Sequence, residues 1–349
     1  HPEIVVARMT KTLRPGKVLL DWSQNTRAKT TICPYSLRGR GGRPTVAARV
    51  RGAWDGDVAW SFRHSPVAVV SAIVLAVCVV AAVFAPWLAP TNPYDLTTLN
   101  LLDALAPPVW QTGGKTGYWL GTDDQGRDVL STIMFGARVS LMVGIASVAL
   151  AVAVGVSLGL VAGYVGGRTD AVIMRIADVQ LSFPAILIAL LINGVAGAVL
   201  PRQSQGDLAL AVLVLAIAAS NWVQYARTVR GSTMVEKNKE YVQAARVIGV
   251  RPAGIMRRHL LPNVLGPVLV LATINIATAI ITEATLSFLG VGVPPTQPSL
   301  GTLIRIGNDF LFSGEWWITL FPGAALVTMV LAINLLGDWL RDALNPKLR

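Results

Sequence analysis

The chain has 349 residues, of which 53% are hydrophobic and only 14% charged, and its mean hydropathy is +0.56. This balance excludes an ordinary soluble domain and is typical of a polytopic membrane protein. The only cysteines are Cys33 and Cys78, so no disulfide framework or cysteine-based metal site is expected. The net charge of +11 would suit nucleic acid, but the distribution of the charges along the chain favours a membrane surface.

The first 65 residues form a basic segment that we expect to be cytoplasmic and largely disordered, since it is too short to bury a core of its own. Within it, residues 17–48 (KVLLDWSQNTRAKTTICPYSLRGRGGRPTVAA) resemble part of the polymerase domain of bacterial end-joining DNA ligases. Most of any active site is missing, so no catalytic residue is carried over and no nucleic-acid partner is expected. A nucleic-acid-binding role stays as an alternative, and it predicts salt-sensitive DNA binding that is lost on deletion of residues 1–50.

Six apolar runs follow, each with about the ~20 residues needed to cross a bilayer. They lie near 66–89, 139–164, 180–200, 208–225, 264–285 and 317–338. Because the first run begins at residue 66, we expect an uncleaved anchor and no cleavable signal peptide. The sequence predicts an all-α membrane domain over residues 66–345, with an outside loop at 90–138, a cytoplasmic loop at 226–263 and a short tail at 346–349.

Lysine and arginine predict the orientation of these crossings. Six crossings place both termini on one side of the membrane, and the segments on that side carry 25 of the 30 Lys and Arg residues. Since cytoplasmic segments are enriched in these residues, both the N-terminus and the C-terminus are expected to be cytoplasmic.

The outside loop ends in WLGTDDQGRDVLSTIMFGARVSL, residues 119–141. Thr122 or Asp123 is expected to cap a helix here, and Asp124 to favour its first turn. The segment resembles the one that precedes the second crossing in peptide- and nickel-importer permeases.

Residues 240–263 (EYVQAARVIGVRPAGIMRRHLLPN) predict two short helices joined by an elbow. Val242, Ala245 and Ile248 recur at three-residue spacing and form one apolar stripe. Gly249 suits the left-handed position after a helix, and Pro252 suits the first turn of the next one. The pair at 262–263, Pro-Asn, is expected to end the second helix.

The same segment resembles the cytoplasmic coupling loop of ABC importer permeases. The sequence Gln243-Ala244-Ala245 is followed at the family's spacing by Gly249 and by Leu-Pro at 261–262. Gln243 stands where the family has Glu, so Glu240 is the expected source of a carboxylate. The resemblance implies docking against ATPase subunits through Glu240, Gln243, Ala244, Ala245, Arg246, Gly249, Arg251 and Pro262. Ala244 and Ala245 are expected to allow close approach to an ATPase cleft. A capped pair of interfacial helices with no docking role is the alternative.

Glu283 is an acid embedded in the fifth apolar run, followed by LSFLGVGVPP, which also resembles the peptide-importer permeases. A charge at the centre of a bilayer costs on the order of 2.5–3.5 kcal/mol on insertion scales, so the side chain is expected to face the bundle interior or water. Two interpretations stay open: a pore-lining or gate residue, and a hydrogen bond that packs helices together.

Taken together, the resemblance implies a type I ABC importer permease of the dipeptide, oligopeptide and nickel branch, in the bacterial cytoplasmic membrane. Its implied partners are a second permease subunit, two ATPase subunits that bind ATP and Mg²⁺, an extracytoplasmic substrate-binding protein and membrane lipid. The chain contains no GxxxxGK[ST] phosphate loop, so no cofactor is expected in it and it is not expected to be an enzyme. Peptides are the preferred substrate and nickel or another small solute the alternative. From another class, a secondary transporter that works without ATPases is the second alternative.

Overall fold

The computed structural model describes residues 5–6, 18–19, 57–95, 99–199, 202–294 and 297–344 and divides the chain into two compact units, His1–Gly56 and Asp57–Arg349. In the first unit, the short strands β1 (Val5–Val6) and β2 (Val18–Leu19) pair in parallel. The expectation of disorder over residues 1–65 otherwise falls mostly outside the described residues. Its last part is helical, however, because α2 covers Asp57–His64.

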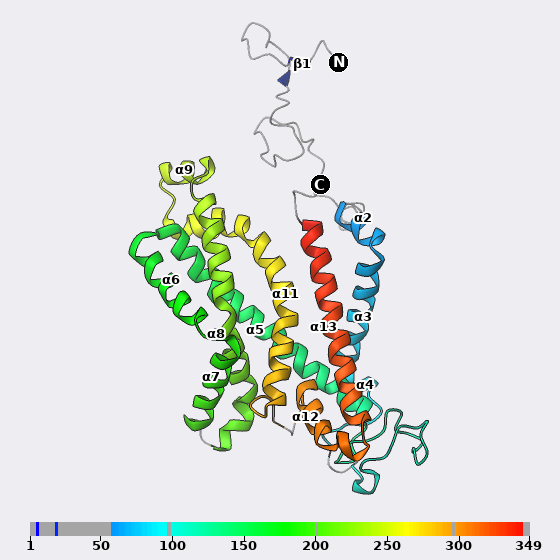
Figure 1. Ribbon diagram of the computed structural model, residues 1–349. Coiled ribbons are helices and arrows are strands. Elements are labelled where there is room, and N and C mark those ends of the chain that lie inside the picture. Colours follow the sequence, from blue (N-terminus) through cyan, green and yellow to red (C-terminus); the bar gives the residue numbers. More distant parts are fainter. Residues whose placement is uncertain are drawn as a thin grey trace. The chain divides into compact units, whose positions relative to one another are not determined.

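The second unit is a bundle of helices (Figure 1). Its elements are α2 (Asp57–His64), α3 (Pro66–Val83), α4 (Ala85–Leu88), η2 (Leu101–Asp103), α5 (Val129–Val165), α6 (Gly167–Leu181), α7 (Ala185–Val199), α8 (Arg202–Glu236), α9 (Glu240–Val247), α10 (Pro252–Ile255), η3 (Met256–Leu260), α11 (Leu261–Phe288), α12 (Leu300–Phe310), η4 (Leu311–Ser313) and α13 (Trp317–Leu344). Five helices among the described residues are long and apolar enough to cross a membrane, and the bent pair α6 and α7 makes a sixth if the two helices are counted as one span. The all-α fold class is confirmed.

The second crossing begins earlier than the sequence suggests. Helix α5 starts at Val129, and its N-cap is Asp128, whose carboxylate accepts a hydrogen bond from the Ser131 backbone N–H at 2.9 Å. The expected caps were wrong: Thr122 lies in the preceding loop, and Asp123 forms a buried ion pair with Arg127 at 2.6 Å. Asp128 caps the helix with the same carboxylate chemistry, five residues after Asp123. The sequence therefore predicted the kind of cap correctly but placed it too early.

The third crossing is broken rather than continuous. Helices α6 and α7 meet at an angle of 92°, with Pro184 in the connection between them. Helix α6 is held against α8 by ion pairs, one of Asp170 with Arg230 and one of Asp178 with Arg227 at 2.5 Å. The apolar run expected at 180–200 is therefore a 15-residue helix preceded by an amphipathic one.

Glycines bring α5 and α8 into backbone contact. Gly155, Gly159 and Gly163 recur every four residues and therefore lie on one face of α5. A Cβ on Gly155 would lie 2.5 Å from the Trp222 carbonyl oxygen, so only glycine fits at this crossing. Small residues serve this purpose in membranes, where helices associate by close packing.

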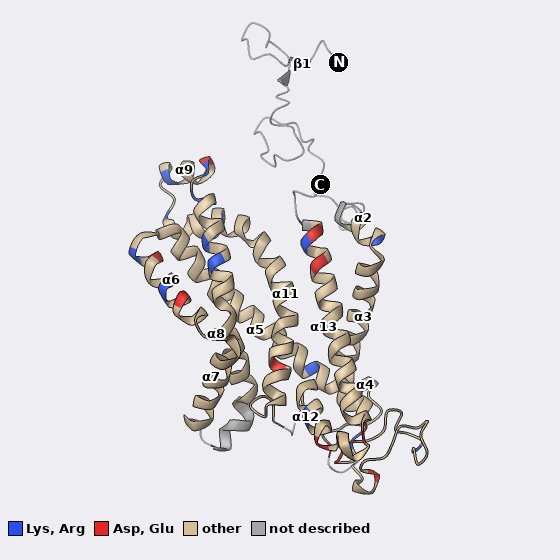
Figure 2. Ribbon diagram, in the orientation of Figure 1, with Lys and Arg blue, Asp and Glu red and all other residues tan. Residues whose placement is uncertain are grey.

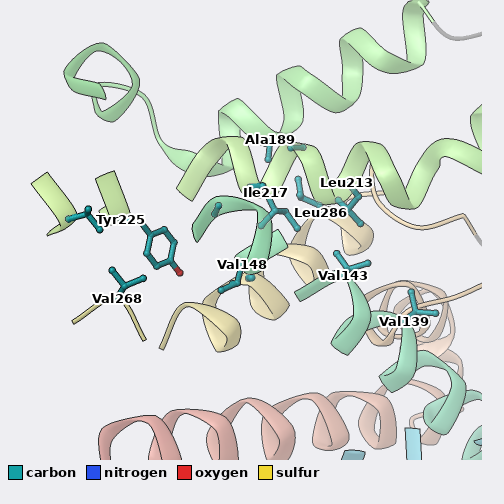
Figure 3. Close-up of a cluster of buried hydrophobic side chains, with 14 of the residues drawn as sticks. Val139, Val143, Val148, Ala189, Leu213, Ile217, Tyr225, Val268 and Leu286 are labelled. Carbon is teal, nitrogen blue, oxygen red and sulfur yellow. The ribbon is translucent and has the colours of Figure 1, made fainter. Parts of the chain in front are cut away.

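Around this crossing, aliphatic side chains from α5, α7, α8 and α11 converge into one core (Figure 3). Its members include Val143, Ala189, Leu213, Ile217 and Leu286, whose side chains have almost no exposed surface. This core fixes the relative positions of the helices from which the cytoplasmic loop projects.

Candidate coupling loop and buried acid

The segment 237–260 projects at one end of the bundle, beyond the ends of α5, α8 and α11 (Figure 1). Helix α2 and the C-terminal end of α13 lie at the same end. Coloured charged segments gather at both ends of the bundle, and the middle parts of the long helices are almost free of them (Figure 2). The loop therefore lies at a charged end of the bundle, beyond the nearly uncharged middle parts of the helices.

The loop has a small hydrophobic core of its own. Val242, Ala245, Ile255 and Leu260 are buried together, and Tyr164 from the end of α5 packs against them. The expected stripe is thus correct for its first two members. Ile248, the third, is 77% exposed, because α9 ends at Val247 and the chain turns away before the stripe continues.

Gly249 forms the elbow with φ of +81°, in the left-handed region that favours glycine. The N–H of Val250 then bonds the Ala245 carbonyl at 3.0 Å, closing the end of α9. Pro252 stands in the first turn of α10, as expected. The prediction for Pro262 was wrong. It lies in the first turn of α11, and the π-helical η3 runs into α11 without a stop.

A hydrogen-bonded tyrosine ties the loop to two crossings. The Tyr241 hydroxyl donates to the Glu236 carboxylate at 2.7 Å and accepts from the Asn263 amide at 3.0 Å. Burial, followed by the bond to Glu236 and its negative charge, raises the pKa of Tyr241 to about 12. The phenol therefore stays neutral at physiological pH and joins the end of α8 to the start of α11.

The other predicted docking residues divide into two groups. Glu240, Gln243, Ala244 and Arg251 are exposed. Ala245 is buried, with only 3% of its surface exposed, so its small side chain contributes to the packing of the loop itself. Arg246 lies over the Tyr164 ring, 5.3 Å from its centroid, in a cation–π contact with the end of α5.

Sequence reasoning missed the most exposed apolar residues of the loop. Val247 is 87% exposed and Ile248 77%, side by side at the tip. Val247 and Ile248 therefore form a small exposed apolar surface at the tip of the loop. The signal was present in the sequence, since Val247 lies outside the apolar stripe and so had no place in the loop core.

Glu283 is completely buried in α11 near the opposite end of the bundle. Its two carboxylate oxygens accept hydrogen bonds from Ser140 of α5 and Ser287 of α11, each at 2.7 Å. Ser140 also accepts from the Leu300 N–H at 3.3 Å, linking the start of α12 to the same cluster. This geometry agrees with the packing interpretation, because hydroxyls of the same chain surround the acid.

Two family profiles cover most of the second unit. Residues 155–349 match the family described as "Binding-protein-dependent transport system inner membrane component". Residues 53–108 match "N-terminal TM domain of oligopeptide transport permease C". The first 55 residues match the primase-polymerase domain of LigD, in agreement with the ligase resemblance noted for residues 17–48.

Curated relatives cover most of the chain and nearly all of their own length. The "Dipeptide transport system permease protein DppC" of Escherichia coli K12 is 44% identical over 82% of this chain and 91% of its own. The "Di/tripeptide transport system permease protein DppC" of Pseudomonas aeruginosa is 39% identical over 83% and 91%. The "Oligopeptide transport system permease protein OppC" of Bacillus subtilis is 37% identical over 84% and 90%.

Proposed function

The chain belongs to the family of binding-protein-dependent transport system inner membrane components, and we propose that it is the subunit through which an ATP-driven importer moves dipeptides or oligopeptides across the membrane. The chain is a multi-pass protein of the inner membrane. Peptides are preferred over nickel because the relatives named above are described as dipeptide, tripeptide or oligopeptide permeases.

The proposal includes the rest of the complex. A second permease subunit completes the membrane part, two ATPase subunits bind ATP and Mg²⁺, and an extracytoplasmic binding protein delivers the peptide. The chain itself binds no nucleotide and catalyses no reaction. The proposed orientation has both termini in the cytoplasm. Among the described residues of the second unit, the end of the bundle that holds the loop, α2 and the end of α13 carries most of the Lys and Arg residues, which favours this orientation.

The observation that carries the coupling role is the exposed apolar tip of a loop that is fixed at its base. Val247 and Ile248 form the apolar centre of the docking surface, and Glu240, Gln243, Ala244 and Arg251 form its polar surroundings. Gly249, Ala245 and Arg246 shape the loop and hold it on α5. When ATP draws the ATPases together, the loop moves with them and the helices alternate between inward and outward openings.

Introducing a negative charge at the tip of the loop tests whether the tip docks on an ATPase subunit. Val247→Glu and Ile248→Glu leave the loop core untouched, so the permease should insert and fold normally. Burying a carboxylate against the ATPase is strongly unfavourable, so co-purification of the ATPase and peptide uptake should both fall by at least tenfold. Leu102→Glu is the matched control, because Leu102 is 87% exposed but lies in the outer loop.

Wild-type uptake by Val247→Glu would reject docking at the tip. A wild-type chain that transports peptide without any ATPase would instead favour a secondary transporter. Those two outcomes separate the coupling role from the importer class.

A further inference from the structure

The helices of the membrane layer expose different kinds of side chain, and one exposed face carries several polar residues. Helix α3 exposes only aliphatic residues over two turns, among them Val70, Ile73 and Val77, as expected of a face that meets lipid. Helix α11 differs. Thr278, Thr282 and Thr285 all lie on its exposed side.

These threonines share one face with an amide pair at the seam between α11 and α8. Asn275 precedes Thr278 by three residues, and the spacing of three, four and three places all four side chains on one face of α11. The Asn275 amide donates to Gln224 Oε1 of α8 at 3.3 Å and to the Tyr225 hydroxyl at 2.9 Å. We call Gln224, Asn275, Thr278, Thr282 and Thr285 the polar stripe.

Contact with lipid hydrocarbon would be energetically unfavourable for the polar stripe. A threonine tolerates hydrocarbon because its hydroxyl bonds the preceding turn, as Thr282 does to the Thr278 carbonyl at 2.8 Å. The exposed carboxamide of Gln224 accepts one hydrogen bond, from Asn275, and its remaining capacity would be lost in hydrocarbon, where no water is available. An exposed amide next to three hydroxyls within membrane-spanning helices is therefore better placed against water, a polar ligand or another subunit than against lipid.

We infer that the polar stripe lines the path of the substrate and hydrogen-bonds the peptide backbone during its passage. This rests on the proposed function and assigns it a surface. The stripe contains hydroxyls and carboxamides, which both donate and accept, and it has no charged member. Backbone amides are common to all peptides, so such a surface would hold peptides of different side chains with similar weak affinity, as a path that must also release them requires.

Cysteine labelling tests whether the stripe is wet. In the complete importer in proteoliposomes, with Cys33 and Cys78 replaced by Ser and Ala, Thr278→Cys and Thr282→Cys should react with a charged, membrane-impermeant thiol reagent. Addition of the dipeptide Ala-Ala together with the substrate-binding protein and ATP should change the rate of labelling severalfold. Val77→Cys on α3, 63% exposed, is the control that should not react.

Two results would overturn the inference. If the stripe cysteines react no faster than Val77→Cys, the face meets lipid. If they resist the reagent and instead cross-link to the second permease, the face is a closed subunit interface. Failure of the unmodified importer to take up dipeptide would reject the proposed substrate but would leave the accessibility result intact.

A second measurement distinguishes hydrogen bonding to the backbone of the transported peptide from simple access of the stripe to water. Thr278→Val and Thr282→Val keep the side-chain volume and remove one hydroxyl each, and each should lower the uptake rate by roughly 2- to 10-fold. Thr273→Val makes the same change on another face of α11, where the hydroxyl bonds the Val270 carbonyl, and should leave uptake unchanged. Equal uptake by all three variants would refute the role in peptide binding.

Discussion

Replacing Gly155 by alanine should force α5 and α8 apart. The new Cβ would lie 2.5 Å from the Trp222 carbonyl oxygen and 2.6 Å from the Tyr225 Cβ, where ordinary contacts begin near 3.4 Å. The helices must therefore separate by about 1 Å at a crossing where neither backbone can give way independently. Overpacking of this kind costs about 1–3 kcal/mol.

The higher helix propensity of alanine stabilises the variant and partly offsets the clash, so its contribution has to be measured separately. Alanine is favoured over glycine in a helix by about 1 kcal/mol, so the net loss in Gly155→Ala is smaller than the clash. Gly231→Ala provides the correction, because Gly231 lies in α8 and a Cβ added there would have nothing within 4 Å. The difference between the two variants isolates the clash.

Thermal unfolding of the detergent-solubilised permease measures both variants. Gly155→Ala should melt several degrees below Gly231→Ala, since about 1 kcal/mol corresponds to a shift on the order of 2–4 °C in chains of a few hundred residues. Equal melting temperatures would refute the close-packed crossing, because the same propensity change would then act without a clash.

Three further predictions concern the buried acid, the ion pair between α6 and α8, and the loop before α5. Glu283→Leu should lower stability by about 2–4 kcal/mol, because two buried hydroxyls lose their acceptor, while Glu283→Gln should lose less; thermal unfolding ranks them. Arg230→Ala should free Asp170 and raise hydrogen exchange in α6, with α13 unchanged as the internal reference. Lys115 holds the pKa of Asp103 below its ordinary 3.8, so their contact stabilises the loop before α5 at pH values above 3.8. This stabilisation is lost as the pH falls through the lower pKa of the folded state. Proteolysis of the loop between pH 6 and pH 3 measures the loss, with Lys115→Met as the control.

Features set by neighbouring residues in the sequence could be predicted. The five long apolar helices follow from runs of apolar residues, and the elbow follows from Gly249 and Pro252, whose backbone preferences act locally. The start of α5 was misplaced because three aspartates compete for one capping position within six residues, and only the folded loop decides that Asp123 pairs with Arg127.

Contacts between distant segments could not be predicted from periodicity. Arg246 has the character of a free surface cation in the sequence, yet it lies on Tyr164, which is remote in the chain. The exposure of Ile248 likewise depends on where α9 ends in three dimensions. The glycines at 155, 159 and 163 are a missed signal, since their four-residue spacing already indicates a close helix contact.

One run of helix joins the loop to the threonines of the polar stripe. Residues Pro252–Phe288 are helical throughout, so a displacement of α10 would act on the threonines of α11. Two places along it can bend: the π-helical η3, whose hydrogen bonds are irregular, and Pro267, which lacks the N–H that would bond the preceding turn. Tyr241 bonds Asn263, between these two places, and fixes that stretch to the end of α8. Bending at Pro267 would therefore tilt Thr278, Thr282 and Thr285 relative to the loop, while the loop, the end of α8 and the start of α11 move as one piece.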